Sequence, residues 1–361
     1  MNASKLTGDL HIVWAIASKD IVDSLRNKLV ISLILALGLM LSFPKALSWV
    51  LESPHTSVPV YDLGDSRLAV ALDDDSQFDL REASSIQELE KLLINTLEPE
   101  LGLVVPADFD QVLESGGQPE LDGYVAWANR GKASSLKSEF EREFGELLGQ
   151  PVRINVAGNF VYPPPDSAIL SSIATITAVT LILVMGLQLV PLLLFEEKQT
   201  KTMDALLVSP ASIGQVVVGK ALAGLFYILV AAGVVLAVNW AAVVHWDVAL
   251  LFVIGIGLFA VATGLVLGSF FHSQQETISW VTALIVLFVG AMFADSMGLQ
   301  SSAFVQGMIP WIPSVALVDV LRCSFLEHAP WGEVWANLGR VAGVSLVLYA
   351  VVVYRVRRSD R

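Results

Sequence analysis

The sequence has very few of the residues that covalent cross-links, metal sites and catalytic centres need. Its 361 residues include a single cysteine, Cys323, which excludes an intrachain disulfide. The five histidines stand singly along the chain, and no group of His, Cys and Glu has the spacing of metal ligands. The patterns Gly-x-Ser-x-Gly and His-Glu-x-x-His are absent as well. We therefore expect no catalytic residue and no metal site in this chain.

A nucleotide-binding loop is also lacking. Residues 214–221, GQVVVGKA, come within one residue of the pattern G-x-x-x-x-G-K-[ST], in which the last hydroxyl holds Mg²⁺. Ala221 has no hydroxyl, and a long apolar run follows where the pattern needs a strand, a loop and a helix. The match is therefore accidental, and we expect the chain to bind no nucleotide and no other cofactor.

Charge is scarce, at 16% of residues against 54% hydrophobic, and the mean hydropathy is +0.64. The charged share is lower, and the hydrophobic share higher, than in soluble globular domains. Five apolar runs are long enough to cross about 30 Å of hydrocarbon as helices, and a sixth is shorter but free of charge. The sequence thus predicts an α-helical polytopic membrane protein with six transmembrane helices, at 29–50, 168–195, 216–244, 248–271, 278–294 and 336–354. Because the span interiors hold almost no ionisable groups, an ion-coupled transporter is not expected.

The uneven distribution of charge predicts the orientation in the membrane. Lys and Arg side chains cluster before the first span, between the second and third, and after the last, which places these segments and both termini in the cytoplasm. Residues 52–167 carry 22 Asp and Glu against 8 Lys and Arg, and they form a long insert that this rule does not govern. We expect a multi-pass protein of the cell membrane with an acidic domain outside.

The external insert, 52–167 between the first and second spans, reads as an α/β domain. Ser85-Ile-Gln-Glu88 is a capping box that opens a helix, and Gly116-Gly117 ends another. Alternation of short apolar runs with amphipathic stretches fills the rest. The expected strands are 68–72, 101–105, 124–127 and 152–156, and the expected helices are 85–97, 107–114 and 132–148.

Two further segments allow alternative interpretations. Residues 1–28 suit a helix lying along the inner membrane surface, although a solvated tail is the alternative. Residues 299–327, which contain Pro310-Trp-Ile-Pro313, Asp319 and Arg322, are apolar but too broken to span. They suit a re-entrant pair of short helices in the outer leaflet, with an ordinary external loop as the alternative.

The fourth span carries small residues at every fourth position, Ala260, Gly264 and Gly268. This spacing places the three on one helix face and lets the backbone of a neighbouring helix approach closely. We expect the three residues to form a helix-packing seam.

The inner loop between the second and third spans, FEEKQTKTMDALLVSPASIGQVVVGK, is dense in charge and long for a simple connection between helices. A short helix bounded by Glu196-Glu197 and Pro210 would offer a docking element to a soluble partner. A solvated loop with interfacial lysines is the alternative.

Within this loop the residues Glu197, Lys198, Thr202, Asp204, Leu206, Leu207, Ser209 and Pro210 are followed by Gly219-Lys220 at the start of the next span. This order resembles the permease subunits of ATP-binding-cassette exporters of the type-2 (type V fold) group, in the drug-efflux-like branch with a large external domain. Similarity extends to IASKDIVDSLRNK (an elbow helix), GLVVPADFDQVLESG (the external domain) and IPWIPSVALVDVLR (the re-entrant region). Lys201 and the absence of glycine in KQTKT depart from the family pattern.

The resemblance implies an organisation: an elbow helix 1–28, a first transmembrane helix 29–51, the external domain 52–167, and a five-helix domain 168–361 with a coupling loop 196–212 and a re-entrant segment 299–327. It implies that this loop and a second inner turn contact an ATPase subunit, through Glu196, Glu197, Lys198, Thr202, Asp204, Leu206, Leu207, Ser209, Pro210, His272, Gln274 and Glu276. Lys220 would anchor its helix at the lipid headgroups.

The function implied by the resemblance is export of a hydrophobic or amphipathic compound, such as a drug or lipid. ATP and magnesium would be held by a separate cytoplasmic ATPase subunit, two per complex, and a second permease subunit would complete a homo- or heterodimer in the bilayer, with no nucleic acid involved. The alternative is a non-transporting membrane receptor or anchor whose acidic external domain binds a partner. The identity of the substrate and the direction of transport stay open at this point.

Overall fold

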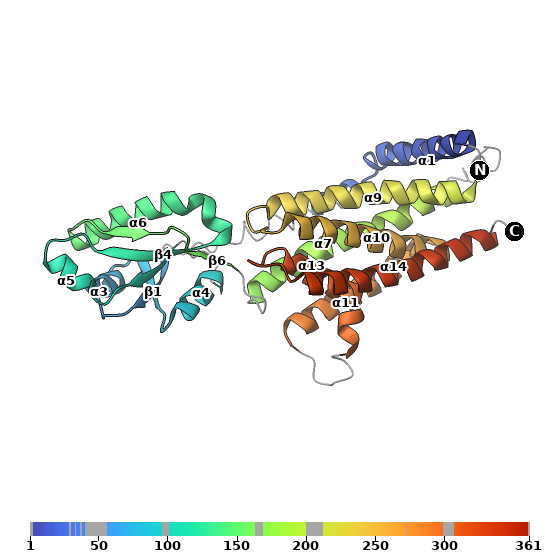
Figure 1. Ribbon diagram of the computed structural model, residues 1–361. Helices are drawn as coiled ribbons and strands as arrows, with labels where there is room; N and C mark the ends of the chain where they lie inside the picture. The colour runs from blue at the N-terminus through green and yellow to red at the C-terminus, as the bar shows by residue number, and fades with distance from the viewer. Residues whose placement is uncertain are drawn as a thin grey trace.

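The computed structural model describes residues 3–28, 30–32, 34–36, 38–39, 56–95, 101–162, 169–199, 212–271, 273–298 and 307–359. These residues form an α/β part and a bundle of long helices, which lie at opposite ends of an elongated molecule (Figure 1). Both chain ends lie at the end of the bundle away from the α/β part, which we call the termini end. The predicted first span, 29–51, falls mostly outside the described residues.

The α/β part is built on one mixed sheet with strand order β2-β1-β3-β4-β5, while β6 pairs with β4. Strand β1 lies next to the edge strand β2 and is parallel to both β2 and β3. Strand β4 runs antiparallel to β3, and β5 is parallel to β4. The strands are β1 (Thr56–Asp62), β2 (Phe78–Glu82), β3 (Gly102–Val105), β4 (Glu120–Ala126), β5 (Arg153–Asn155) and β6 (Phe160–Val161). Three of the strands, β3, β4 and β5, correspond to the last three predicted strands, whereas β1, β2 and β6 were not predicted.

Helices pack on this sheet around a core that includes Phe109, Phe140 and Phe144, each nearly fully buried. The helices are α3 (Arg67–Asp74), α4 (Ile86–Asn95), α5 (Phe109–Glu114), the 3-10 helix η1 (Trp127–Lys132) and α6 (Ala133–Leu148). They include the three predicted helices, with Ser85 capping α4 by accepting the N–H of Glu88 at 3.2 Å.

One predicted strand is wrong, because residues 68–72 lie in helix α3. Leu68 and Leu72, four residues apart, are both fully buried, which is the spacing of one helix face. The hydroxyl of Ser66 accepts the N–H of Ala69 and caps the first turn. The run Leu-Ala-Val-Ala-Leu fits the spacing of a strand and that of a helix. The cap at Ser66 and the burial of both leucines on one face show that it is a helix.

The bundle contains five described helices that are long and apolar enough to cross a membrane. Each has at least 23 residues, or at least about 34 Å at 1.5 Å per residue. They are α7 (Ile169–Gln199), α9 (Ile213–Val238), α10 (Trp246–Phe270), α11 (Gln274–Ser296) and α14 (Trp331–Ser359), and they match the last five predicted spans. A further helix, α1 (Ala3–Ser24), precedes them.

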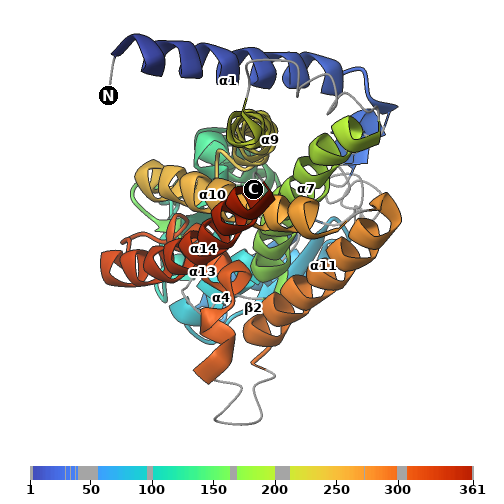
Figure 2. The same cartoon turned by 90° about the vertical axis from the view of Figure 1, so that its right-hand side faces the viewer.

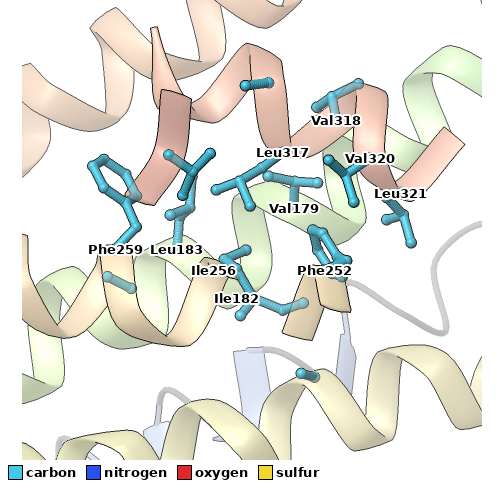
Figure 3. Close-up of a cluster of buried hydrophobic side chains, with 14 of the residues drawn as sticks. Val179, Ile182, Leu183, Phe252, Ile256, Phe259, Leu317, Val318, Val320 and Leu321 are labelled. Carbon is cyan, nitrogen blue, oxygen red and sulfur yellow. The ribbon is translucent and has the colours of Figure 1, made fainter. Parts of the chain in front are cut away.

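Helix α10 lies at the centre of the bundle and packs against α7, α9, α13 and α14. Its side chains Phe252, Ile256 and Phe259 meet apolar side chains of α7 and α13 in a continuous buried cluster (Figure 3). The opposite face carries exposed apolar residues such as Leu250 and Leu258, so α10 is apolar all round, as expected of a span that meets protein on some sides and lipid on another.

The small residues Ala260, Gly264 and Gly268 lie where α10 contacts α7. A methyl group added to Gly264 would lie 2.7 Å from Cβ of Val190 and 2.9 Å from the carbonyl oxygen of Gly186. One added to Gly268 would lie 2.5 Å from Leu194. The two backbones therefore approach too closely for any larger side chain on this face of α10.

The segment predicted to be re-entrant holds η2 (Ile309–Trp311) and α13 (Pro313–Cys323), while residues 299–306 lie outside the described part. Helix α13 has only 11 residues, too short to span. It packs against α7, α10, α11 and α14, and the Ser314 hydroxyl donates to the carbonyl of Phe288 at 3.2 Å. Its charged residue Arg322 donates to the Ser296 hydroxyl at 2.7 Å.

The α/β part contacts the bundle through Arg130 in η1. The guanidinium of Arg130 donates to the carbonyl oxygens of Ala241, in the turn between α9 and α10, and of Trp127 at 2.9 Å. It also lies over the Trp127 ring, 4.2 Å from the centroid. The Trp127 contacts lie within the α/β part. The bond to Ala241 ties this part to the end of the bundle opposite the termini, and the same guanidinium lies 5.9 Å from the ring centroid of Trp240 in the same turn.

Candidate coupling site

The two ends of the proposed coupling loop are fixed by helices. Helix α7 continues through Glu196, Glu197 and Lys198 to Gln199, so the loop begins later than the predicted end of the span. Helix α9 begins directly after Ser212. The remaining loop residues named above, Thr202, Asp204, Leu206, Leu207, Ser209 and Pro210, lie outside the described residues.

A capping box closes the second end of the loop. The Ser212 hydroxyl accepts the N–H of Gln215 at 3.3 Å, and the Gln215 side chain accepts the N–H of Ser212 at 2.8 Å. The box thus gives hydrogen-bond partners to two of the backbone N–H groups at the start of α9. The sequence analysis did not identify this box, although the pattern Ser-x-x-Gln before an apolar run is its ordinary signal.

Helix α1 lies across α9 at the termini end, as the view down the bundle shows (Figure 2). The face of α1 that meets the bundle carries Val13, Ala17, Asp20 and Ser24, all buried, whereas Trp14 on another face is 64% exposed. The spacing of the buried residues is that of one helix face. The described part of this segment is therefore a helix packed on the bundle, and its location along a membrane surface stays a prediction.

Gly219 lies where α1 and α9 pack closely together. A methyl group added there would lie 2.8 Å from Cγ2 of Ile16 and 3.2 Å from the carbonyl oxygen of Val13. Such distances are shorter than van der Waals contact, so only glycine lets α1 lie this close to α9. The glycine of the Gly-Lys pair thus has a packing role.

The neighbouring Lys220 is buried between the same two helices. Its Nζ donates to Oδ2 of Asp20 at 3.0 Å, and the two side chains are only 2% and 10% exposed. The structure differs here from the expected headgroup anchor, because α1 covers this part of α9. Asp20 lies 200 positions away in the sequence, and no local pattern could have identified it as the partner.

Two further contacts attach the chain near α1 to the bundle. The hydroxyl of Tyr227 on α9 donates to the carbonyl of Ile21 at 2.5 Å. Val30, just beyond α1, is fully buried against a cluster that includes Leu189 and Leu193 of α7. The elbow segment is therefore held by α9 and α7, the two helices that flank the coupling loop.

The second inner turn lies between α10 and α11. His272 lies outside the described residues, while Gln274 and Glu276 fall in the first turn of α11, where the Ser273 hydroxyl accepts the N–H of Glu276 at 3.2 Å. Arg355 near the end of α14 lies 4.8 Å from the ring centroid of Phe270. This contact brings the turn close to the C-terminal end of the chain.

A small apolar cavity lies between α7 and α11, which pack against each other around it. Its volume is about 10 Å³, room for one water molecule at most. The Thr180 hydroxyl at its wall is buried and has no hydrogen-bond partner within the described part of the chain. The other lining residues are Leu183, Val184, Leu187, Ile285, Phe288, Val289 and Met292. Across the described ranges, no group of three His, Cys, Asp or Glu residues could hold a metal ion.

Comparison with known proteins agrees with this arrangement. Residues 29–354 match the family model described as "ABC-2 family transporter protein". The chain is 26% identical, over 377 aligned residues, to the "Probable multidrug ABC transporter permease YbhR" of Escherichia coli K12, with 94% of this chain and 98% of the relative covered. The protein of the same name from Escherichia coli O157:H7 matches to the same extent. A match over nearly the whole chain shows that this multi-pass membrane protein belongs to the ABC-2 family of transporter proteins.

Proposed function

We propose that the protein is the membrane-spanning permease subunit of an ABC exporter that moves a hydrophobic or amphipathic compound out of the cell. The observation that carries this proposal is the family match together with the likeness over nearly the full length to a multidrug ABC transporter permease. The buried joint between α1 and α9, next to the end of the coupling loop, supports it. The energy comes from ATP hydrolysed by a separate subunit, because this sequence has no loop that cradles a triphosphate.

The apolar character of the spans supports a hydrophobic or amphipathic substrate. The described cavity between α7 and α11 is walled by seven apolar side chains and one threonine hydroxyl, Thr180. Sites for small molecules are mostly apolar with a few polar groups that set orientation. Spans with almost no ionisable side chains suit a drug-like or lipid-like compound better than a small ion.

The proposed complex contains two permease subunits and two cytoplasmic ATPase subunits. The coupling loop 196–212 and the turn with His272, Gln274 and Glu276 contact the ATPase, and closure of the ATPase subunits on ATP moves the helices that flank the loop. In the proposed topology six spans place both termini inside and the α/β part outside. The location of both chain ends opposite the α/β part supports this topology (Figure 1).

The topology can be tested by labelling introduced cysteines with an impermeant thiol reagent, after replacement of the single Cys323. We expect Asp74→Cys, at an exposed position of α3, to react in intact cells, and Lys19→Cys, at an exposed position of α1, to react only after permeabilisation. The reverse pattern would show that the orientation is inverted.

The export function can be tested in cells that lack their own efflux pumps, with ethidium and doxorubicin as amphipathic probes. Cells with both the permease and its ATPase should accumulate several-fold less probe than cells with the permease and an ATPase whose P-loop lysine is replaced. Equal accumulation in the two strains, when the two subunits copurify, would contradict the proposed substrate class. Absence of copurification would contradict the exporter itself.

A further inference from the structure

The ion pair between Asp20 and Lys220 joins two helices that are remote in sequence. Both side chains are nearly out of contact with solvent, at 10% and 2% exposed, and Nζ lies 3.0 Å from Oδ2. Taking two charges out of water is costly, and apolar residues of similar volume often replace such a pair without loss of stability. Stability alone therefore gives no reason for this pair.

The two helices also meet through apolar contacts, such as Ile16 against Gly219. Apolar contact is non-directional, so it holds helices together but resists sliding weakly. A buried ion pair with a hydrogen bond fixes the register, because leaving either charge buried without its partner is strongly unfavourable. The ion pair thus fixes the position of α1 along α9.

Lys220 lies eight residues after Ser212, the cap at which the coupling loop ends. At 1.5 Å per residue this is about 12 Å along α9. Helix α1 therefore contacts α9 within about two turns of the end of the loop, in the part of α9 that a moving loop displaces first.

We propose that Asp20 and Lys220 are positioning residues. They make α1 and the start of α9 move together as a rigid unit, so that a displacement of the coupling loop is carried into α1. This inference rests on the proposed exporter function. Without the pair, α1 slips along α9, and part of each ATP-driven displacement is lost before it reaches the rest of the bundle.

The test uses the full permease with its ATPase in proteoliposomes, and it measures the amount of ethidium transported per ATP hydrolysed. The main variant is Asp20→Asn with Lys220→Met, which removes both charges of the pair. Its matched control is Lys19→Met with Asp23→Asn, which removes one charge of each sign from exposed positions of α1. A third variant, Asp20→Lys with Lys220→Asp, exchanges the two charges.

We expect the main variant to recruit the ATPase and to hydrolyse ATP within twofold of the wild type, while transport per ATP falls at least fivefold. The control should keep the wild-type ratio, and the exchanged pair should recover at least half of it. A wild-type ratio in the main variant would overturn the proposal, as would its failure to fold, since the pair would then be a requirement of folding. If the wild-type complex itself neither assembles nor transports, the proposed function fails instead.

Discussion

Replacing Leu206 and Leu207 together with alanine is expected to abolish both recruitment of the ATPase and export. In the proposed complex these two leucines form the buried centre of the contact, with Glu197, Lys198 and Asp204 around them as a polar rim. Truncation of a buried anchor at a protein interface costs more than about 2 kcal/mol, whereas loss of a rim charge costs less and mainly changes the on-rate. A pull-down of the ATPase by each variant, with an efflux assay beside it, measures the effect.

The matched control is Leu250→Ala with Leu258→Ala. These two leucines of α10 are 58% and 44% exposed, and they lie on a helix that the coupling loop does not adjoin. Recruitment and export should stay near the wild-type level in this control. Normal recruitment and export by the Leu206 and Leu207 variant would show that the loop is only a connection, and a membrane receptor or anchor would then be the better interpretation.

Replacing Gly264 with leucine is expected to prevent the bundle from packing. Even the first carbon of the new side chain would lie 2.7 Å from Cβ of Val190 and 2.9 Å from a backbone oxygen of α7. Overpacking a core by single methylene groups costs about 1–3 kcal/mol, and here a whole side chain meets backbone that cannot rotate away, so we expect a loss of more than about 3 kcal/mol. Thermal unfolding of the purified protein in detergent, with its gel-filtration profile, measures the outcome.

Gly290→Leu provides the control for this substitution. A Cβ added to Gly290 on α11 would meet no atom within 4 Å among the described residues, so this variant should unfold within a few degrees of the wild type. A Gly264→Leu protein that stays monodisperse and melts together with the Gly290→Leu protein would mean that α7 and α10 do not meet at this glycine.

The long helices of the bundle could be predicted because a run of apolar residues that exceeds the membrane thickness has few alternatives in structure. Their ends could not be predicted as well. Helix α7 continues through Glu196, Glu197 and Lys198 to Gln199, because charged residues are good helix formers and do not by themselves end a helix.

The sheet of the α/β part was predicted less completely, for identifiable reasons. The inner strand β1 contains Pro59, a residue that ordinarily argues against a strand paired on both sides. The edge strand β2, Phe78-Asp-Leu-Arg-Glu82, is mostly polar and lacks a clear apolar face. These two segments are strands because of the strands that pair with them, and the local sequence does not reveal those partners.

At the coupling site, too, local sequence predicted some features, whereas contacts between distant residues could not be predicted. The order of residues from Glu197 to Lys220 identified the loop and the helix after it, but the environment of Lys220 depends on Asp20 in a helix 200 residues earlier. A lysine at the end of an apolar run suggests a headgroup anchor, and only the tertiary fold shows that α1 covers it.

We expect this chain to transport only when a separate ATPase subunit supplies the energy. The direct measurement is ATP hydrolysis and ethidium uptake by proteoliposomes that contain the purified chain, with and without its ATPase facing outward. We predict that the chain alone shows neither activity, and that addition of the ATPase produces both, whereas an ATPase with its P-loop lysine replaced produces neither. ATP hydrolysis that persists in the purified chain after every copurifying ATPase has been removed would contradict the account.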